Sequence, residues 1–118
     1  MSFGFKYGIP SEADLVFDVR CFPNPFYVVG LREKTGLDSE VADYILSHKQ
    51  TVAFIEKLQE MIDFLLPHYM NESISQLIIS IGCTGGKHRS VCISEILKKH
   101  LLENSYNAVS IHRDINKA

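Results

Sequence analysis

The segment IGCTGGKHRS combines two glycines with residue types that bind or attack phosphate groups. Cys83 and Arg89 are separated by five residues and Ser90 follows, which is the C-x5-R spacing of cysteine-dependent phosphatases. A phosphatase also requires a general acid. Asp18 and Asp114 are available, as is Asp38, but no sequence context identifies one of them as that acid. The segment is therefore either a catalytic loop or a loop that only binds phosphate.

The same segment fits an anion site without any catalysis. A loop that leaves a buried strand and enters a helix exposes unpaired backbone N–H groups at the positive end of the helix dipole. Glycines let such a loop curve around an anion, and an arginine in the first helical turn offers a planar fork to phosphate oxygens. We predict no catalytic residue. The predicted phosphate-binding residues are Cys83, Thr84, Gly85, Gly86, Lys87, His88, Arg89 and Ser90.

Two common nucleotide-binding motifs are excluded by spacing. In a Walker A loop, the first glycine stands where this chain has Ile81, and a hydroxyl residue follows the lysine where this chain has His88. A G-x-G-x-x-G fingerprint is also absent.

Hydrophobic patterning surrounds this loop with alternating strands and helices. The predicted strands are residues 2–8, 14–20, 75–83 and 107–114. Apolar residues at helical spacing predict a short helix after Asp38 and helices over 51–69 and 89–103. Residues 21–36, with two prolines and two glycines, predict a long loop. The predicted fold class is α/β, one domain over residues 1–118, with a small and mostly parallel sheet flanked by helices.

Further polar residues follow the predicted strands, where ligands bind in open α/β sheets. Asp18 and Arg20 lie two apart on one strand face, and an ion pair between them is the alternative to ligand contact. Asn24, between two prolines, is either a sugar contact or part of a turn.

Two more pairs complete the predicted rim of the site. Thr35 and Gly36 precede a helix start, and a plain helix signal is their alternative reading. His112 and Arg113 follow the last predicted strand, and the alternative is a solvated terminus.

The charge composition argues against nucleic acid and membranes as binding partners of the whole surface. A net charge of −2 and a pI near 6.2 give no global attraction to nucleic acid or membranes. No segment reads as a signal peptide or a transmembrane span, so we expect a cytoplasmic protein. Three cysteines without CxxC spacing indicate reduced thiols, and no metal site or cofactor is predicted.

The motifs GFKYGIP, ADLVFDVR, PNP, TGLD, IGCTGGKHRSV and HRD occur in this order over residues 2–114. In this the chain resembles the C-terminal domain of the RapZ family, the bacterial RNase adapter proteins and their YvcJ-like nucleotide-binding relatives. The resemblance implies a fold similar to a phosphofructokinase subdomain. It implies a metabolite sensor that binds glucosamine-6-phosphate or UDP-N-acetylglucosamine through the CTGGKHRS loop. Our own hypothesis is that residues 21–36 close over the sugar. The resemblance further implies an N-terminal ATPase domain in family members, and we expect this chain to correspond to their C-terminal domain alone.

The resemblance also implies RNA binding and a homodimer. The enteric adapter has a histidine after PNP, whereas this chain has Phe26, as the Gram-positive relatives have an aromatic residue there. The basic tail that binds RNA in the enteric branch is replaced by DINKA, which has too little positive charge for strong phosphate-backbone binding. RNA binding is therefore the weakest of these expectations.

Overall fold

Three short parallel strands form one open sheet in the computed structural model, which describes residues 1–117. The strands are β1 (Ser2–Gly4), β2 (Leu15–Asp18) and β3 (Ile79–Cys83), in the order β1-β3-β2. In the register, Phe3 pairs with Gly82 and Phe17 pairs with Ile81. Because all three strands run in parallel, their carboxyl ends meet at one edge of the sheet.

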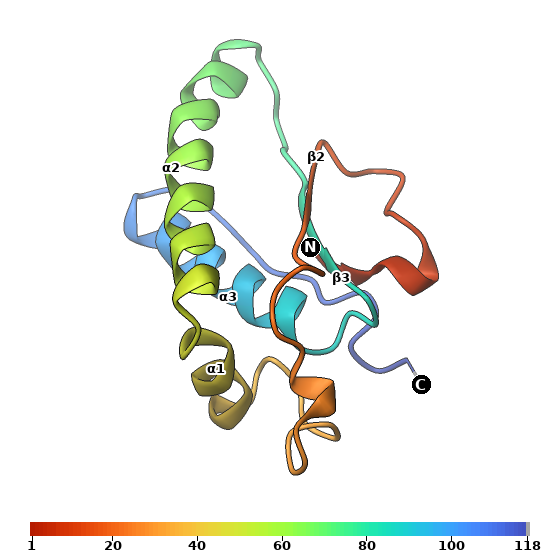
Figure 1. The fold of residues 1–118 in the computed structure, drawn as a ribbon. Helices are drawn as coiled ribbons and strands as arrows, with labels where there is room; N and C mark the ends of the chain where they lie inside the picture. Colours follow the sequence, from red (N-terminus) through yellow and green to blue (C-terminus); the bar gives the residue numbers. More distant parts are fainter. Residues whose placement is uncertain (118) are drawn as a thin grey trace.

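The helices are α1 (Ser39–Leu46), α2 (Lys49–Asn71) and α3 (Arg89–Glu103). Two short 3-10 helices, η1 (Phe5–Tyr7) and η2 (Pro25–Tyr27), follow β1 and β2. Figure 1 shows α2 and α3 on one side of the strands and the loop after η1 on the other side. The predicted α/β class, with a small parallel sheet flanked by helices, is confirmed.

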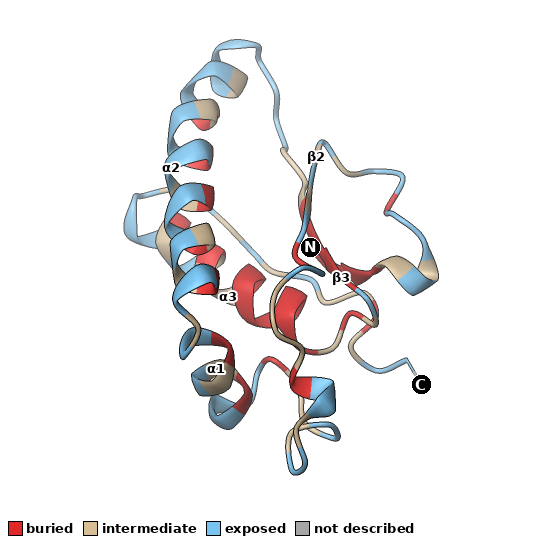
Figure 2. Ribbon diagram, viewed as in Figure 1, coloured by how far each residue is buried: buried red, intermediate tan, exposed pale blue. Residues whose placement is uncertain are grey.

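The main hydrophobic core lies between β3, α2 and α3. The α2 residues in it recur every three or four positions, as an amphipathic helix requires. Central members are Ile55, Leu58, Ile62, Ile81, Cys83, Ile93 and Leu97. Figure 2 shows that the first turns of α3 are buried almost all round, whereas most of α2 is exposed on its outer side. This burial fixes the start of α3 against the end of β3.

Three predicted strands differ clearly from the structure. The strand predicted over 2–8 ends at Gly4, because Lys6 N donates to Thr84 O and the chain turns through η1. The strand predicted over 107–114 does not form. Its pairing with β1 is limited to an isolated parallel bridge between Ser2 and His112, because Gly4 N donates to Asp114 Oδ2 and not to a backbone oxygen. The strand predicted over 75–83 begins only at Ile79.

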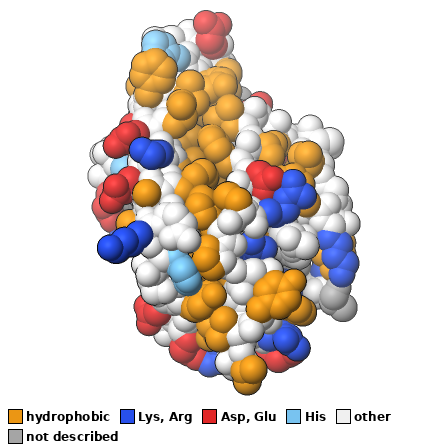
Figure 3. Space-filling model, in the orientation of Figure 1, with side chains coloured by type: hydrophobic (Ala, Val, Ile, Leu, Met, Phe, Trp, Pro, Cys, Tyr) orange, Lys and Arg blue, Asp and Glu red, His pale blue; other side chains and the backbone are white. Residues whose placement is uncertain are grey.

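Hydrophobic side chains gather between α2 and β2 on the face shown in Figure 3. Over residues 1–117, no helix combines the length and the apolar composition that crossing a membrane requires.

Candidate functional site

The glycine loop (residues 83–90) lies at the carboxyl edge of the sheet, between β3 and the first turn of α3. Gly86 has a φ of 77°, a conformation that favours glycine. A Cβ there would lie 2.6 Å from the Gly4 nitrogen and 2.9 Å from the Asp114 Cβ. The loop therefore folds against β1 at a closeness that only glycine permits.

A cavity of about 320 Å³, here called the loop cavity, opens beside this loop. Six of the eight predicted phosphate-binding residues line it: Cys83, Thr84, Gly85, Lys87, His88 and Arg89. The other two do not. Gly86 packs against Gly4, and the Ser90 hydroxyl lies 3.1 Å from the Cys83 Sγ. The structure thus brings most of the predicted loop residues to one hollow at the start of α3.

Two buried side chains in the cavity wall have nitrogen atoms without a hydrogen-bond partner. His88 is only 5% exposed and its Nε2 is unpaired among the described residues. Arg89 is 3% exposed; its Nη1 donates to the backbone oxygens of Arg20 and Phe22 at 2.8 and 2.9 Å, while its Nε is unpaired. Buried polar groups in native proteins nearly always have partners. Both nitrogen atoms are themselves shielded from solvent, so a ligand in the loop cavity would reach them only after a movement of the cavity wall.

The electrostatics of His88 favour a neutral ring in the free domain. Burial lowers the pKa of the His88 imidazole below its ordinary value, and nearby backbone groups of Lys34, Arg32 and Leu31 oppose that shift. The positive charge of Lys87 also lowers this pKa. An anion placed in the loop cavity would act in the opposite direction and favour the charged ring.

Asp18 and Arg20 form an ion pair with each other. The Arg20 Nη2 lies 2.7 Å from the Asp18 Oδ2, and the guanidinium lies 3.9 Å from the centroid of the Phe5 ring. The hydrogen bond from Arg20 lowers the pKa of Asp18. Neither residue lines the loop cavity, so the structure realises the ion pair that the sequence left open as an alternative.

The three other residues predicted from the long loop have local structural partners. The Asn24 Oδ1 accepts from Phe26 N at 3.1 Å, and the Asn24 side chain still lines the cavity. Thr35 Oγ1 accepts from Leu37 N, outside the cavity. Gly36 N donates to Lys87 O at 2.8 Å, and a Cβ at Gly36 would lie 2.3 Å from His88 O. Gly36 therefore holds the long loop directly against the glycine loop.

His112 and Arg113 do not reach the loop cavity. His112 Nδ1 lies 2.6 Å from the Ser2 hydroxyl, at the start of β1 rather than at its carboxyl end. Arg113 pairs with Asp114 at 2.8 Å, and Asp114 also accepts from Gly4 N. Burial would raise the pKa of the fully buried Asp114 carboxyl, but these hydrogen bonds and that from Lys117 outweigh it and lower the pKa to about 2. Asp114 thus serves as an ionised anchor beneath Gly86.

The opposite wall of the loop cavity was not predicted from the sequence. It comes from three separate segments: η1, the region around η2, and the end of the chain. Its residues, besides Asn24, are Lys6, Tyr7, Phe26, Tyr27, Arg32, Glu33 and Lys117. The available signals were the aromatic and basic residues of FKYG and the two aromatic residues that end PNPFY.

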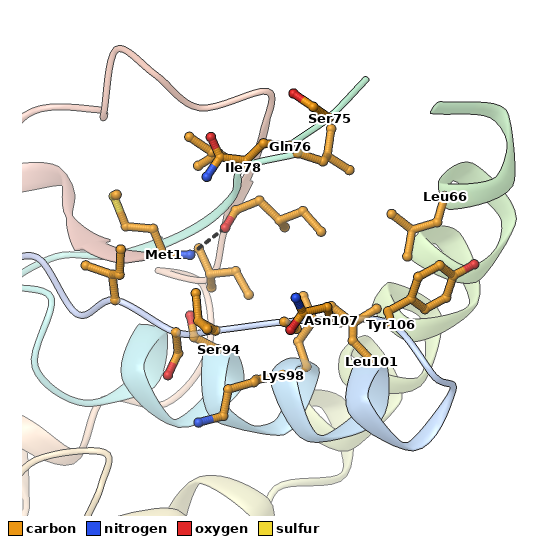
Figure 4. A pocket seen from close by; sticks show the side chains of 18 residues that line it. Met1, Leu66, Ser75, Gln76, Ile78, Ser94, Lys98, Leu101, Tyr106 and Asn107 are labelled. Carbon is orange, nitrogen blue, oxygen red and sulfur yellow. Dashed lines mark hydrogen bonds between the residues drawn. The ribbon is translucent and has the colours of Figure 1, made fainter. Parts of the chain in front are cut away.

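A larger cavity of about 630 Å³, here called the end cavity, lies near the amino ends of the strands (Figure 4). Met1 and Lys98 line it together with apolar residues from Leu66 to Ile111, and the Met1 amine donates to Ile79 O at 2.7 Å. None of the predicted site residues lies in this wall. The loop cavity is therefore the candidate site.

Residues 1–116 match the family model described as the RapZ C-terminal domain. The chain belongs to this family. The resemblance predicted from the sequence motifs is thereby confirmed.

Similar relatives of this RapZ C-terminal domain are called nucleotide-binding proteins. The chain is 59% identical to one from Shouchella clausii and 56% identical to one from Bacillus thuringiensis, in each case over 117 residues. The aligned part covers 99% of this chain but only 39% and 40% of the two relatives. The chain therefore spans about two fifths of the length of the curated relatives that it matches.

Proposed function

We propose that this RapZ C-terminal domain is a sensory domain whose glycine loop binds a phosphorylated or nucleotide-activated amino sugar. The two candidate ligands are glucosamine-6-phosphate and UDP-N-acetylglucosamine. The observation that carries the proposal is the cavity at the start of α3, which six residues of the glycine loop line, among them Lys87, His88 and Arg89. The two relatives are named nucleotide-binding proteins, which agrees with a binding role.

The start of α3 and the cavity wall beside it suit a phosphate group. The first backbone N–H groups of α3 are not used within the helix, and the helix dipole favours negative charge there. The Thr84 hydroxyl and the Lys87 ammonium belong to the same wall. A phosphate at this point would accept from backbone and side-chain donors together, as in other helix-terminus sites.

Binding would be transmitted through the long loop. Gly36 and the carbonyls of Arg20 and Phe22 already touch the glycine loop or Arg89, so residues 21–36 are placed to respond to a ligand. In the longer family members we propose that this response changes contacts with the N-terminal ATPase domain or with a second copy of the domain. A domain whose two conformations differ in ligand affinity would act as a metabolite switch.

Calorimetric titration of the purified domain with both candidate sugars tests the proposal. The Lys87→Ala substitution should weaken the binding of at least one of them roughly tenfold, because it removes one cation from the phosphate site. Lys57→Ala, which removes the same charge from the exposed outer side of α2, is the matched control and should bind like the parent. Arg89→Ala is less informative, since Arg89 also holds two loop carbonyls.

Two results would contradict the sensor proposal. One is the absence of saturable binding of either sugar to the folded domain. The other is equal weakening by Lys87→Ala and Lys57→Ala, which would show that the loss reflects net charge and not the glycine loop.

One contact favours a second candidate function, a cysteine-dependent phosphatase. The 3.1 Å contact between Cys83 Sγ and the Ser90 hydroxyl places a thiol and a hydroxyl together in the loop. The pKa values of the available carboxyl groups argue against a phosphatase. Arg20 lowers the pKa of Asp18, and hydrogen bonds lower the pKa of Asp114 to about 2. Neither carboxyl group therefore holds a proton at neutral pH that it could donate to a leaving group. Release of inorganic phosphate during the titrations, abolished by Cys83→Ser, would establish the phosphatase.

A further inference from the structure

The wall of the loop cavity that faces the glycine loop is aromatic and exposed. Phe26 and Tyr27 are 44% and 77% exposed, and both line the cavity together with Tyr7. Their ring centroids lie 5.4 Å apart with the ring planes at 89°. Rings that contribute this little to the core, placed beside an anion site, offer flat surfaces on which a ligand can stack.

These rings stand on a rigid base. Pro25 at the start of η2 is buried, the Asn24 side chain accepts from Phe26 N, and Val28 N donates to Pro25 O. Arg32 Nε donates to Phe26 O at 3.0 Å, and its guanidinium lies 4.7 Å from the centroid of the Phe26 ring. The platform is thus formed before a ligand arrives, which lowers the entropic cost of binding.

The charge of the cavity exceeds what one phosphate requires. Its wall contains five cations, Lys6, Arg32, Lys87, Arg89 and Lys117, and one carboxylate, Glu33. Asp114 pairs with Lys117 at 2.7 Å, so the local net charge is +3. The whole chain has a net charge of −2. Lys117 lies 4.7 Å from the centroid of the Tyr7 ring, so positive charge extends from the glycine loop to the aromatic wall. A ligand with more than one phosphate would use both parts.

We propose that Phe26, Tyr27 and Tyr7 form a nucleobase subsite, so that the ligand is a nucleoside diphosphate or its sugar ester rather than a bare sugar phosphate. This proposal rests on the proposed function and specifies the ligand class of the same site. The diphosphate would lie against the glycine loop and the base against the aromatic wall. Stacking on an aromatic side chain tolerates any base, so the geometry selects a nucleotide without selecting which one.

The test compares ligands that share the phosphates but differ in the base. The domain is titrated with UDP, inorganic pyrophosphate and glucosamine-6-phosphate, and the same series is repeated with Tyr27→Ala. Because Tyr27 is largely exposed, the variant should fold normally. UDP should bind the parent domain roughly tenfold more tightly than pyrophosphate, and Tyr27→Ala should remove most of that difference. Pyrophosphate affinity should not change.

Phe64→Ala is the matched control, because Phe64 is a 65% exposed aromatic residue on α2, outside the loop cavity. It should leave all three affinities unchanged. If glucosamine-6-phosphate saturates the domain while UDP binds no better than pyrophosphate, the sensor stands and the nucleobase subsite is overturned. If no phosphate ligand binds, both proposals fail. Tighter binding of a single-stranded oligonucleotide than of UDP would replace the nucleotide by RNA and also overturn the subsite.

Discussion

At the scale of single residues, His88 is the group whose charge should report the ligand. Burial keeps its pKa below the ordinary value in the free domain. A diphosphate in the loop cavity, which His88 lines, would raise that pKa, so binding would take up a proton. Affinity for UDP-N-acetylglucosamine should therefore increase as the pH falls through the pKa of the complex, and should be flat above it.

Titrations between pH 8 and pH 6 measure this dependence. The diphosphate of this ligand does not titrate in that range, so a slope belongs to the protein. His88→Gln keeps a hydrogen-bonding side chain without a titrating ring and should give a flat profile. A slope that persists in His88→Gln would assign the proton to another group.

Residue types alone also explain how far the site could be predicted. Glycines, a cationic fork and a strand before a helix are local signals, and six of the eight residues that they indicated line the loop cavity. The spacing of Asp18 and Arg20 correctly indicated a shared face. It could not indicate that the two side chains would satisfy each other, because that depends on which charges stand nearby in the fold.

At the scale of elements, the long loop and α3 are joined by a contact without room for a side chain. A Cβ at Gly36 would lie 2.3 Å from His88 O and 2.6 Å from Cys92 N, both backbone atoms at the start of α3. Gly36→Ala should therefore displace the loop or the helix and lower the free energy of unfolding by about 2 kcal/mol. Urea denaturation followed by circular dichroism would measure it.

Gly85→Ala is the control for this substitution. No atom lies within 4 Å of a Cβ at Gly85, and its φ is not in the left-handed region, so its stability should match the parent. Equal stability of Gly36→Ala and Gly85→Ala would show that the long loop is not fixed to α3 in solution.

The elements were predictable where their patterns are local. The stripe of α2 and the buried run of β3 identified both elements, although the strand begins four residues later than predicted. The aromatic wall could not be predicted from the sequence. The segments η1 and η2 follow β1 and β2, and they reach the glycine loop only because β3 lies between these two strands in the sheet. Nothing in the local sequence encodes that β3 lies between β1 and β2. The strand predicted over 107–114 was wrong for another reason. Its pattern suits a strand, but the Asp114 side chain accepts from Gly4 N in place of a backbone oxygen, and pairing stops at the bridge between Ser2 and His112.

At the scale of the whole molecule, positive charge is concentrated in one hollow. The loop cavity holds five of the twelve basic residues and one of the fourteen acidic residues, which leaves a net charge of −6 over the rest of the chain. Such a surface repels an extended phosphate backbone even though the cavity attracts a small anion.

We therefore expect no saturable binding of a long double-stranded RNA at 150 mM salt, and a much smaller effect of salt on UDP binding than on any residual RNA binding. Fluorescence anisotropy over a series of salt concentrations measures both. Micromolar RNA affinity with a steep salt dependence would contradict this expectation and would restore the RNA adapter as a function of this domain.

The two hydrogen bonds from Arg89 Nη1 to the carbonyls of Arg20 and Phe22 have a thermodynamic consequence. A ligand that drew this guanidinium away would leave two backbone oxygens without their donor, and part of its intrinsic affinity would be spent on releasing residues 20–22. Observed affinity would then understate the strength of the contacts. Amide hydrogen exchange in the same segment would rise on saturation, so the concentration of a small metabolite would be read out as the local opening of a surface loop.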